Sequence, residues 1–209
     1  MLSDQVKLGR HAERGSYDFE TVAGIFDEAL ICHVGFVPAD GQPVVLPTIH
    51  VRIDRALYLH GSVLARWLKN AAGTKLCVTA TLVDAIVLAR SAFNSSMNYR
   101  SAVVMGVAEV VESEDERNTA LEALVEHVCP GRWADVRLPT EGELRTTLVV
   151  KLPIEEASAK IRSGPPGDFE GDLSSDYWAG LLPLRTVRGE PIPHPELRAG
   201  IPVPRYLRS

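Results

Sequence analysis

The sequence predicts a β-rich α+β protein in which helices surround an antiparallel barrel. Short apolar runs follow one another with hairpin turn signals between them, and helical patterns interrupt these runs without alternating regularly with them. Neither a G-x-G-x-x-G nor a Walker sequence occurs, so a doubly wound nucleotide-binding sheet is not indicated. The length of 209 residues and the apolar content of 45% suit one globular domain over residues 1–209.

Helix starts are marked by capping residues. A polar arm over residues 1–17 precedes Asp18, a candidate N-cap. Apolar residues at helical spacing follow it: Val22, Ile25, Phe26, Ala29 and Leu30. Ser62 is a candidate N-cap of a helix that ends at Gly73. Two candidate capping boxes come later, formed by Ser113 with Glu116 and by Thr140 with Glu143.

Strands are expected between these helices. Asp40-Gly41 is a strong hairpin signal, and Asp54-Arg55 marks a second turn. The β runs are residues 30–37, 43–51, 56–61, 75–83, 86–92, 93–110, a run into Pro153, and 177–187. A Gly, Pro and acid-rich loop is expected over residues 164–176, and a proline-rich tail over residues 189–209 is expected to cover the surface.

Charge and composition exclude several classes of function. The net charge of −5 argues against a protein devoted to nucleic acid. No apolar run approaches the roughly 20 residues that span a bilayer, and the N-terminus has no apolar leader, so a cytoplasmic protein without membrane contact is expected. The three cysteines are far apart and show no C-x-x-C spacing, and no dedicated metal site is expected.

The first candidate site is an anion site at the end of a strand. His60 and Gly61 end a strand, Ser62 caps the predicted helix, and the first N–H groups of that helix would point into the same space. Arg66 could reach back to add a charge-assisted contact to a phosphate. The alternative is that Ser62 only caps the helix and Arg66 only lies on its solvated face.

Two strands supply further candidates. Tyr99 and Ser101 alternate with Arg100, so Arg100 faces the opposite side, and Ser101 needs a partner that a ligand or a carbonyl group could supply. Pro47 can lie only in an edge strand or at a bulge, and unpaired backbone groups of such a strand, beside Thr48, could bind the edge of a planar heterocycle. No Ser/His/Asp set or carboxylate pair stands out, and no residue is identified as catalytic.

Six segments, in this order, resemble the FMN-binding split barrels related to pyridoxamine 5′-phosphate oxidase, and within them the branch that includes the nitroimidazole-resistance proteins. They are "RHAERGSYD", "ALICHVGF", "GQPVVLPTIHV", "LYLHGS", "SMNYRSAVVMG" and "WAGLLPLR". The resemblance extends from about Arg10 to Trp178 and beyond. It implies a six-stranded antiparallel split β-barrel with peripheral helices, and a homodimer with FMN at its interface.

The resemblance also implies which residues bind the flavin. The matching positions are Pro47, Thr48, Ile49 and His50 along the ring, His60, Gly61, Ser62 and Arg66 at the phosphate, Tyr99, Arg100 and Ser101 on a later strand, and Trp178 near the C-terminus. Two features of the oxidases are missing. The phosphate turn lacks their Thr-Asn with a following Arg-Lys pair, and their Arg-His-Arg substrate signature after Trp-x-Gly is absent, so oxidation of pyridoxamine phosphate is not expected.

The sequence therefore favours an FMN-binding oxidoreductase that uses a small-molecule electron donor or substrate. The alternative is a non-catalytic module that binds a flavin or haem. In a haem protein, His33, His50 or His60 could ligate iron. A deazaflavin in place of FMN also stays open.

Overall fold

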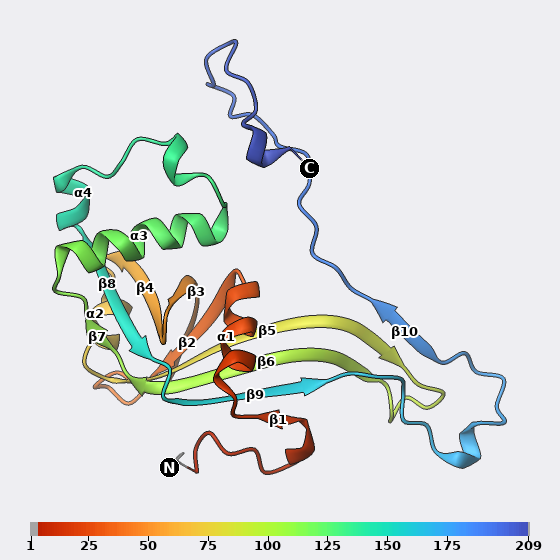
Figure 1. The fold of residues 1–209 in the computed structure, drawn as a ribbon. Coiled ribbons are helices and arrows are strands. Elements are labelled where there is room, and N and C mark those ends of the chain that lie inside the picture. The colour runs from red at the N-terminus through yellow and green to blue at the C-terminus, as the bar shows by residue number, and fades with distance from the viewer. Residues whose placement is uncertain (1–3, 209) are drawn as a thin grey trace.

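The computed structural model describes residues 4–208, apart from the side chain of Arg66. This part of the chain forms four α-helices and one antiparallel sheet of ten strands, which curls without closing into a barrel (Figure 1). The prediction of a β-rich antiparallel fold is confirmed. The expected number of six strands is not confirmed, in part because β1 and β7 add two residues each at the margins of the sheet, too few to carry a periodic signal of their own.

The strands are β1 (Gly15–Ser16), β2 (Ile31–Phe36), β3 (Val44–Ile53), β4 (Ala56–Ser62), β5 (Lys75–Leu88), β6 (Ser96–Val107), β7 (Glu109–Val110), β8 (Thr147–Pro153), β9 (Glu156–Arg162) and β10 (Gly180–Pro183). The helices are α1 (Phe19–Glu28), α2 (Arg66–Ala71), α3 (Glu114–Val128) and α4 (Glu141–Arg145). The sheet order is β1-β9-β6-β5-β2-β3-β4-β8-β7, with β10 paired to β5 outside this path.

Helix α1 forms as its sequence predicts and covers part of the sheet. The Asp18 carboxylate caps it by accepting a hydrogen bond from the backbone N–H of Thr21 at 2.9 Å. Its face toward the sheet buries Val22, Ile25 and Phe26 in the main apolar core. The helical spacing predicted as far as Leu30 is wrong at its end, because the helix stops at Glu28 and Leu30 lies exposed before β2.

Both predicted turns are confirmed. β2 and β3 pair antiparallel, from Ile31 opposite Ile49 to Phe36 opposite Val44, and Gly41 in their connection has a φ of +79°. Asp54 between β3 and β4 has a φ of +49°, a conformation that aspartate tolerates better than most residues.

The expected helix start at Ser62 is wrong. α2 has six residues, and its N-cap Ala65 makes no side-chain cap hydrogen bond. Ser62 instead ends β4, and its hydroxyl accepts the N–H of Leu64 at 3.1 Å. A serine hydroxyl can satisfy a nearby backbone group in a local turn as well as at a helix start, so the sequence signal for the two is the same.

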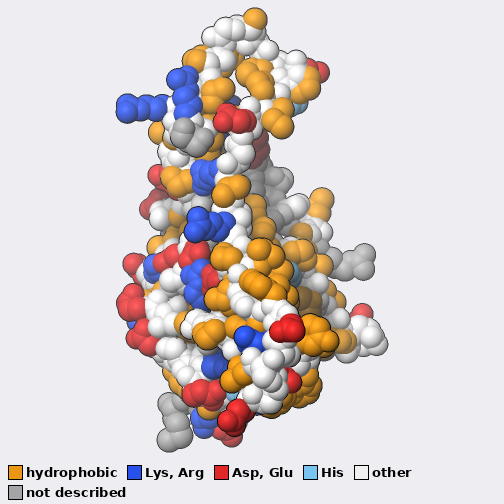
Figure 2. All heavy atoms as spheres, turned by 90° about the vertical axis from the view of Figure 1, so that its right-hand side faces the viewer, with side chains coloured by type: hydrophobic (Ala, Val, Ile, Leu, Met, Phe, Trp, Pro, Cys, Tyr) orange, Lys and Arg blue, Asp and Glu red, His pale blue; other side chains and the backbone are white. Residues whose placement is uncertain are grey.

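β5 and β6 form a long hairpin that extends past the core. The two runs expected on either side of Asp84 are one strand, β5, with an irregularity in its pairing at that residue. The polar residues from Ser96 onward already belong to β6. Figure 2 looks onto the end of the molecule where this hairpin lies, and hydrophobic side chains gather on the face that it shows. The exposed ones from the hairpin and the segments beside it include Phe93, Met97, Phe169 and Trp178.

Residues 113–146 form a helical insertion between β7 and β8 (Figure 1). The capping box of Thr140 and Glu143 is confirmed at the start of α4. At the start of α3 only half of the expected box forms. Ser113 accepts the N–H of Glu116 at 3.3 Å, whereas the Glu116 carboxylate accepts a hydrogen bond from the Tyr58 hydroxyl.

Two apolar clusters hold these layers together. The larger one joins α1 to the sheet, and the smaller one joins α3 to β3, β4 and β8. The smaller cluster is made of Val51, Tyr58, Val111, Ala120, Leu124 and Val149. Across residues 4–208, none of the helices has the length and apolar character needed to cross a membrane.

Candidate functional site

The site begins where β3 and β4 separate. The pairing of β3 with β4 ends at His50, which lies opposite Leu59. Beyond it β4 continues beside β8, with His60 opposite Val149, while β3 continues beside β2, with Ile49 opposite Ile31. Ile49 and His60 therefore face the opening between the two strands.

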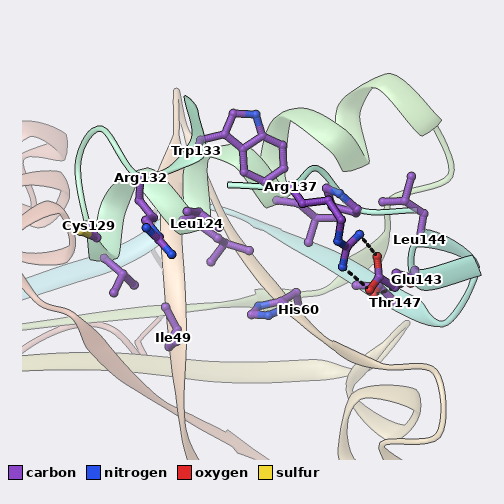
Figure 3. A pocket seen from close by; sticks show the side chains of 14 residues that line it. Ile49, His60, Leu124, Cys129, Arg132, Trp133, Arg137, Glu143, Leu144 and Thr147 are labelled. Carbon is purple, nitrogen blue, oxygen red and sulfur yellow. Dashed lines mark hydrogen bonds and ion pairs between the residues drawn. The ribbon is translucent and has the colours of Figure 1, made fainter. Parts of the chain in front are cut away.

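A cavity of about 510 Å³ fills this opening and is roofed by the helical insertion (Figure 3). Its floor comes from β3, β4 and β8, and α3 supplies an apolar wall that includes Leu124 and Val128. The segment after α3 contributes Arg132 and Trp133. The walls are thus mostly apolar, with a few polar groups at defined places, which is typical of a site for a small molecule or cofactor.

His60 is the titratable group on the cavity floor. Its Nδ1 is buried and has no hydrogen-bond partner in the described chain. Burial lowers the pKa of His60, because the charged imidazolium loses its solvation in this surrounding. The ring is therefore neutral at physiological pH and retains a nitrogen lone pair, which is the form of histidine that binds metal ions.

Two arginines lie above the floor, and they differ in their charge compensation. Arg137 donates two hydrogen bonds to the Glu143 carboxylate, at 2.8 and 2.9 Å, and this pairing helps to lower the pKa of Glu143 to about 2. Arg132 donates to the Tyr206 hydroxyl at 3.1 Å and lies 3.9 Å from the Asp135 carboxylate. Arg132 is thus the cation with the weaker anionic partner.

The structure brings only part of the predicted site together. Ile49 and His60 line the cavity. Pro47 and Thr48 lie on the half of β3 that pairs with β2 alone, so the backbone there has a free edge, as the proline predicts. Gly61 and Ser62, which follow His60 in β4, do not line the cavity. Arg66 begins α2, and its side chain lies outside the described part of the chain.

His50 is buried on the opposite side of β3. It is fully inaccessible to solvent, and its Nε2–H donates to the backbone carbonyl of Phe26 at 2.9 Å. Its ring packs 5.3 Å from the rings of Phe26 and His127. His127 likewise donates to the carbonyl of Ala29, at 3.0 Å. The two histidines thus bind carbonyl groups at and just beyond the end of α1, a structural use of these side chains.

Four other predicted residues lie away from the cavity. Ser101 donates to the carbonyl of Lys160 at 3.3 Å, so the neighbouring strand supplies one of the partners that the sequence left open. Tyr99 is half-buried on the same face of β6, and Trp178 is 68% exposed. Arg100 lies on the other face, as its alternation predicts, and binds the carboxylates of Glu28 and Asp84.

Replacing Arg100 with glutamine should lower the free energy of unfolding by about 1–2 kcal/mol, because the change removes charged hydrogen bonds that join α1 to β5 and β6. This value allows for the partial exposure of these bonds, since water weakens them. Urea unfolding measures the loss. Arg145→Gln is the matched control, since Arg145 meets Glu141 at 3.6 Å with both side chains more than two-thirds exposed. Equal stability of the two variants would contradict the structural role of Arg100.

Sequence reasoning missed the roof of the cavity. The sequence indicates only a capping box at the start of α3, and none of the predicted site residues lies in the segment "PGRWADVRLP" that follows the helix. The signal that could have identified it is a tryptophan with two arginines, Arg132 and Arg137, in a connection between two helices. Apolar and cationic groups concentrated in one loop favour a binding surface over a plain linker.

The fold and the cavity define the class: an open antiparallel sheet with a ligand-sized cavity between diverging strands and a helical insertion. The sequence profile of pyridoxamine 5′-phosphate oxidase matches residues 18–161, more than half of the chain, so this protein belongs to that family. No curated protein matches the chain in sequence.

Solved structures agree with this assignment. The flavocytochrome Anf3 from Azotobacter vinelandii is 36% identical, with a TM-score of 0.91 over 98% of this chain and 95% of the other. An FAD and haem binding protein from Mycobacterium smegmatis is also 36% identical, with a TM-score of 0.87 over 92% and 95% of the two chains. A protein assigned to nitroimidazole resistance in Bacteroides thetaiotaomicron shares the fold at 23% identity and a TM-score of 0.60, over 70% and 86%.

Proposed function

We propose that this protein is a redox protein that binds both haem and a flavin, with the haem in the cavity between the sheet and the helical insertion. Two of the solved structures that it resembles, both at 36% identity, are described as a flavocytochrome and as an FAD and haem binding protein. The observation that carries the proposal is the neutral, unpartnered imidazole of His60 on the floor of an apolar cavity.

The residues of the cavity fit haem. A tetrapyrrole is planar and mostly apolar, which suits walls built from Leu124, Val128 and Trp133. Histidine is a common axial ligand of haem iron, and His60 is the imidazole available at the floor. The two carboxylates of haem need cationic partners, and Arg132 is the arginine whose charge is less compensated.

Among the three histidines that the sequence left open as iron ligands, the structure favours His60. His33 is exposed on β2, outside the cavity lining. His50 uses Nε2 to bind a backbone carbonyl and is enclosed by the rings of Phe26 and His127. Only His60 of these three lines the cavity, where the residue is half-buried and its Nδ1 has no hydrogen-bond partner.

The flavin would lie beside the free edge of β3. The backbone around Pro47 and Thr48 pairs on one side only, and such groups can bind the edge of a flavin ring. We infer that a second copy of the chain completes this site. The hydrophobic face at the end of the β5–β6 hairpin supports a homodimer, because large exposed apolar patches are typical of protein interfaces (Figure 2).

Bound haem and flavin would supply electron transfer, while the chain holds, orients and shields them. An absorption spectrum of the protein, purified and supplied with haem, tests the proposal. We expect a Soret band together with flavin absorbance, and chromatography of the released flavin identifies FMN or FAD. A protein that gives no Soret band on haem titration would rule out the haem site.

Catalysis is a separate question from binding. Reduction of the loaded protein by NADH or NADPH, followed with and without an acceptor, distinguishes an oxidoreductase from a module that only stores or senses its cofactors. Turnover with an acceptor is the result expected of a redox enzyme. Stoichiometric binding without reduction by any donor would favour the non-catalytic module.

A further inference from the structure

The C-terminal segment, residues 184–208, reaches back to the wall of the cavity. It leaves β10 and contains no regular structure until a short 3-10 turn at Arg205–Leu207. Two of its side chains bind the rest of the chain at one place, the end of α3 and the turn after it. Arg188 donates to the carbonyl of Val128 at 3.3 Å, and Tyr206 binds the residues that follow.

The ring of Tyr206 lies against Gly131. A Cβ atom on Gly131 would be 3.4 Å from the Tyr206 ring, and the glycine has a φ of +86°, so this turn and the tyrosine fit closely. The same turn is held from the other side by Glu126, whose carboxylate accepts the N–H groups of Gly131 and Trp133 at 2.6 and 2.7 Å. Tyr206 thus packs on a fixed turn.

The hydroxyl of Tyr206 lies between two opposite charges. It accepts a hydrogen bond from Arg132 at 3.1 Å and donates one to the Asp135 carboxylate at 2.8 Å. Arg132 and Asp135 are 3.9 Å apart, too far for a direct hydrogen bond. Without the hydroxyl, the guanidinium and the carboxylate could close to a direct ion pair, as Arg137 and Glu143 do at 2.8 Å.

Arg132 points into the cavity from the side of α3 (Figure 3). A direct pair with Asp135 would occupy the N–H donors of its guanidinium and neutralise its charge. The hydroxyl bridge leaves most of the five donors of Arg132 free for another anion. The hydroxyl therefore controls whether the cavity offers a usable cation.

We propose that Tyr206 is a positioning residue of the cavity, which holds Arg132 away from Asp135 so that Arg132 can bind the carboxylate of an apolar, planar anion. This inference rests on the proposed haem site and adds the C-terminal segment to it. It also applies to any other apolar anion of similar size, since it depends only on the Arg132 charge.

The test compares two porphyrins on the full-length protein. Tyr206→Phe keeps the ring over Gly131 and removes the hydroxyl. We expect the variant to bind haem about 3- to 10-fold more weakly, the equivalent of one hydrogen bond, and to bind the dimethyl ester of haem as well as the unchanged protein does. Tyr177→Phe, at a tyrosine that is 73% exposed, is the matched control and should change neither affinity.

Rescue separates positioning from packing. Adding Asp135→Asn to Tyr206→Phe removes the carboxylate that competes for Arg132. Arg132 can then bind the haem carboxylate again, so haem affinity should return to within about twofold of that of the unchanged protein. Equal weakening of haem and its ester, no weakening of either, or no rescue would each overturn the role of Tyr206.

Binding of anilinonaphthalene sulfonate, an apolar anion, separates this inference from the haem site. If the unchanged protein binds neither porphyrin, the haem proposal fails, and the dye decides the role of Tyr206. Weaker dye binding by Tyr206→Phe with recovery in the double variant supports it. Unchanged dye binding, or a protein that takes up no dye, overturns it.

Discussion

Replacing His60 with alanine is expected to abolish stable haem binding. In the proposed haem site the imidazole of His60 is the iron ligand, since His60 is the one histidine among the described residues that line the cavity. Loss of groups that merely support a metal ligand typically costs about 10- to 100-fold in affinity, so loss of the ligand itself should exceed about 100-fold. Haem titration followed at the Soret band measures the effect.

Two controls make this result specific. His33→Ala removes an exposed histidine of β2 and should leave the Soret band unchanged. Added imidazole should restore part of the spectrum of His60→Ala, because a free ligand can fill the space that the side chain leaves. Tight haem binding with an unaltered spectrum in the alanine variant would place the iron elsewhere in the protein.

The second large effect is a loss of stability in acid that arises from His50. Its Nε2–H donates to a carbonyl group, so the neutral ring carries its lone pair on Nδ1, which is buried without a partner. A proton on Nδ1 would find no acceptor. Burial is the main cause that lowers the pKa of His50 to about 4, and nearby His127 adds to the shift.

The sign of the effect follows from linkage. Above the unfolded pKa of about 6.5 the ring is neutral in both states, and the full contribution to stability is present. As the pH falls toward 4, the unfolded chain binds a proton that the native protein does not, so stability falls. The loss reaches about 3 kcal/mol near the folded pKa of about 4.

Urea unfolding between pH 7 and pH 4 tests this prediction. His50→Gln can donate an amide N–H to the Phe26 carbonyl and does not titrate. The slope of its unfolding free energy against pH should therefore be smaller by the equivalent of about one bound proton. The comparison of slopes removes the contribution of other groups, including His60, which both proteins share. Equal slopes for the two proteins would show that His50 already carries its charge in the folded state.

Local signals predicted much of the fold. Asp18 with the apolar spacing after it determined α1, and Asp40-Gly41 determined the β2–β3 hairpin, because caps and turns depend on neighbouring residues alone. Where one local motif serves two structures, the prediction failed. Ser62 satisfies a turn at the end of β4, although its sequence context equally suits the start of a helix.

The site divides in the same way. The resemblance predicted Ile49 and His60 as ligand contacts, and the structure places both in the lining of the cavity. Strand alternation placed Arg100 on the face of β6 opposite Ser101. It could not show that His50 turns away from the cavity while His60 faces it. That difference depends on which side of β3 packs against α1. It is set by long-range contacts such as the hydrogen bond from His50 to the carbonyl of Phe26, 24 positions away in the sequence.

The sequence by itself determined the β-rich antiparallel class of fold and the family, since these depend on local pattern and segment order. Only the tertiary structure decided what closes the site. α3, Arg132 and Tyr206 come together from segments 74 residues apart, through packing and charge, and no spacing in the sequence records such an encounter. The physical reason is that long-range contacts form only once the chain has folded.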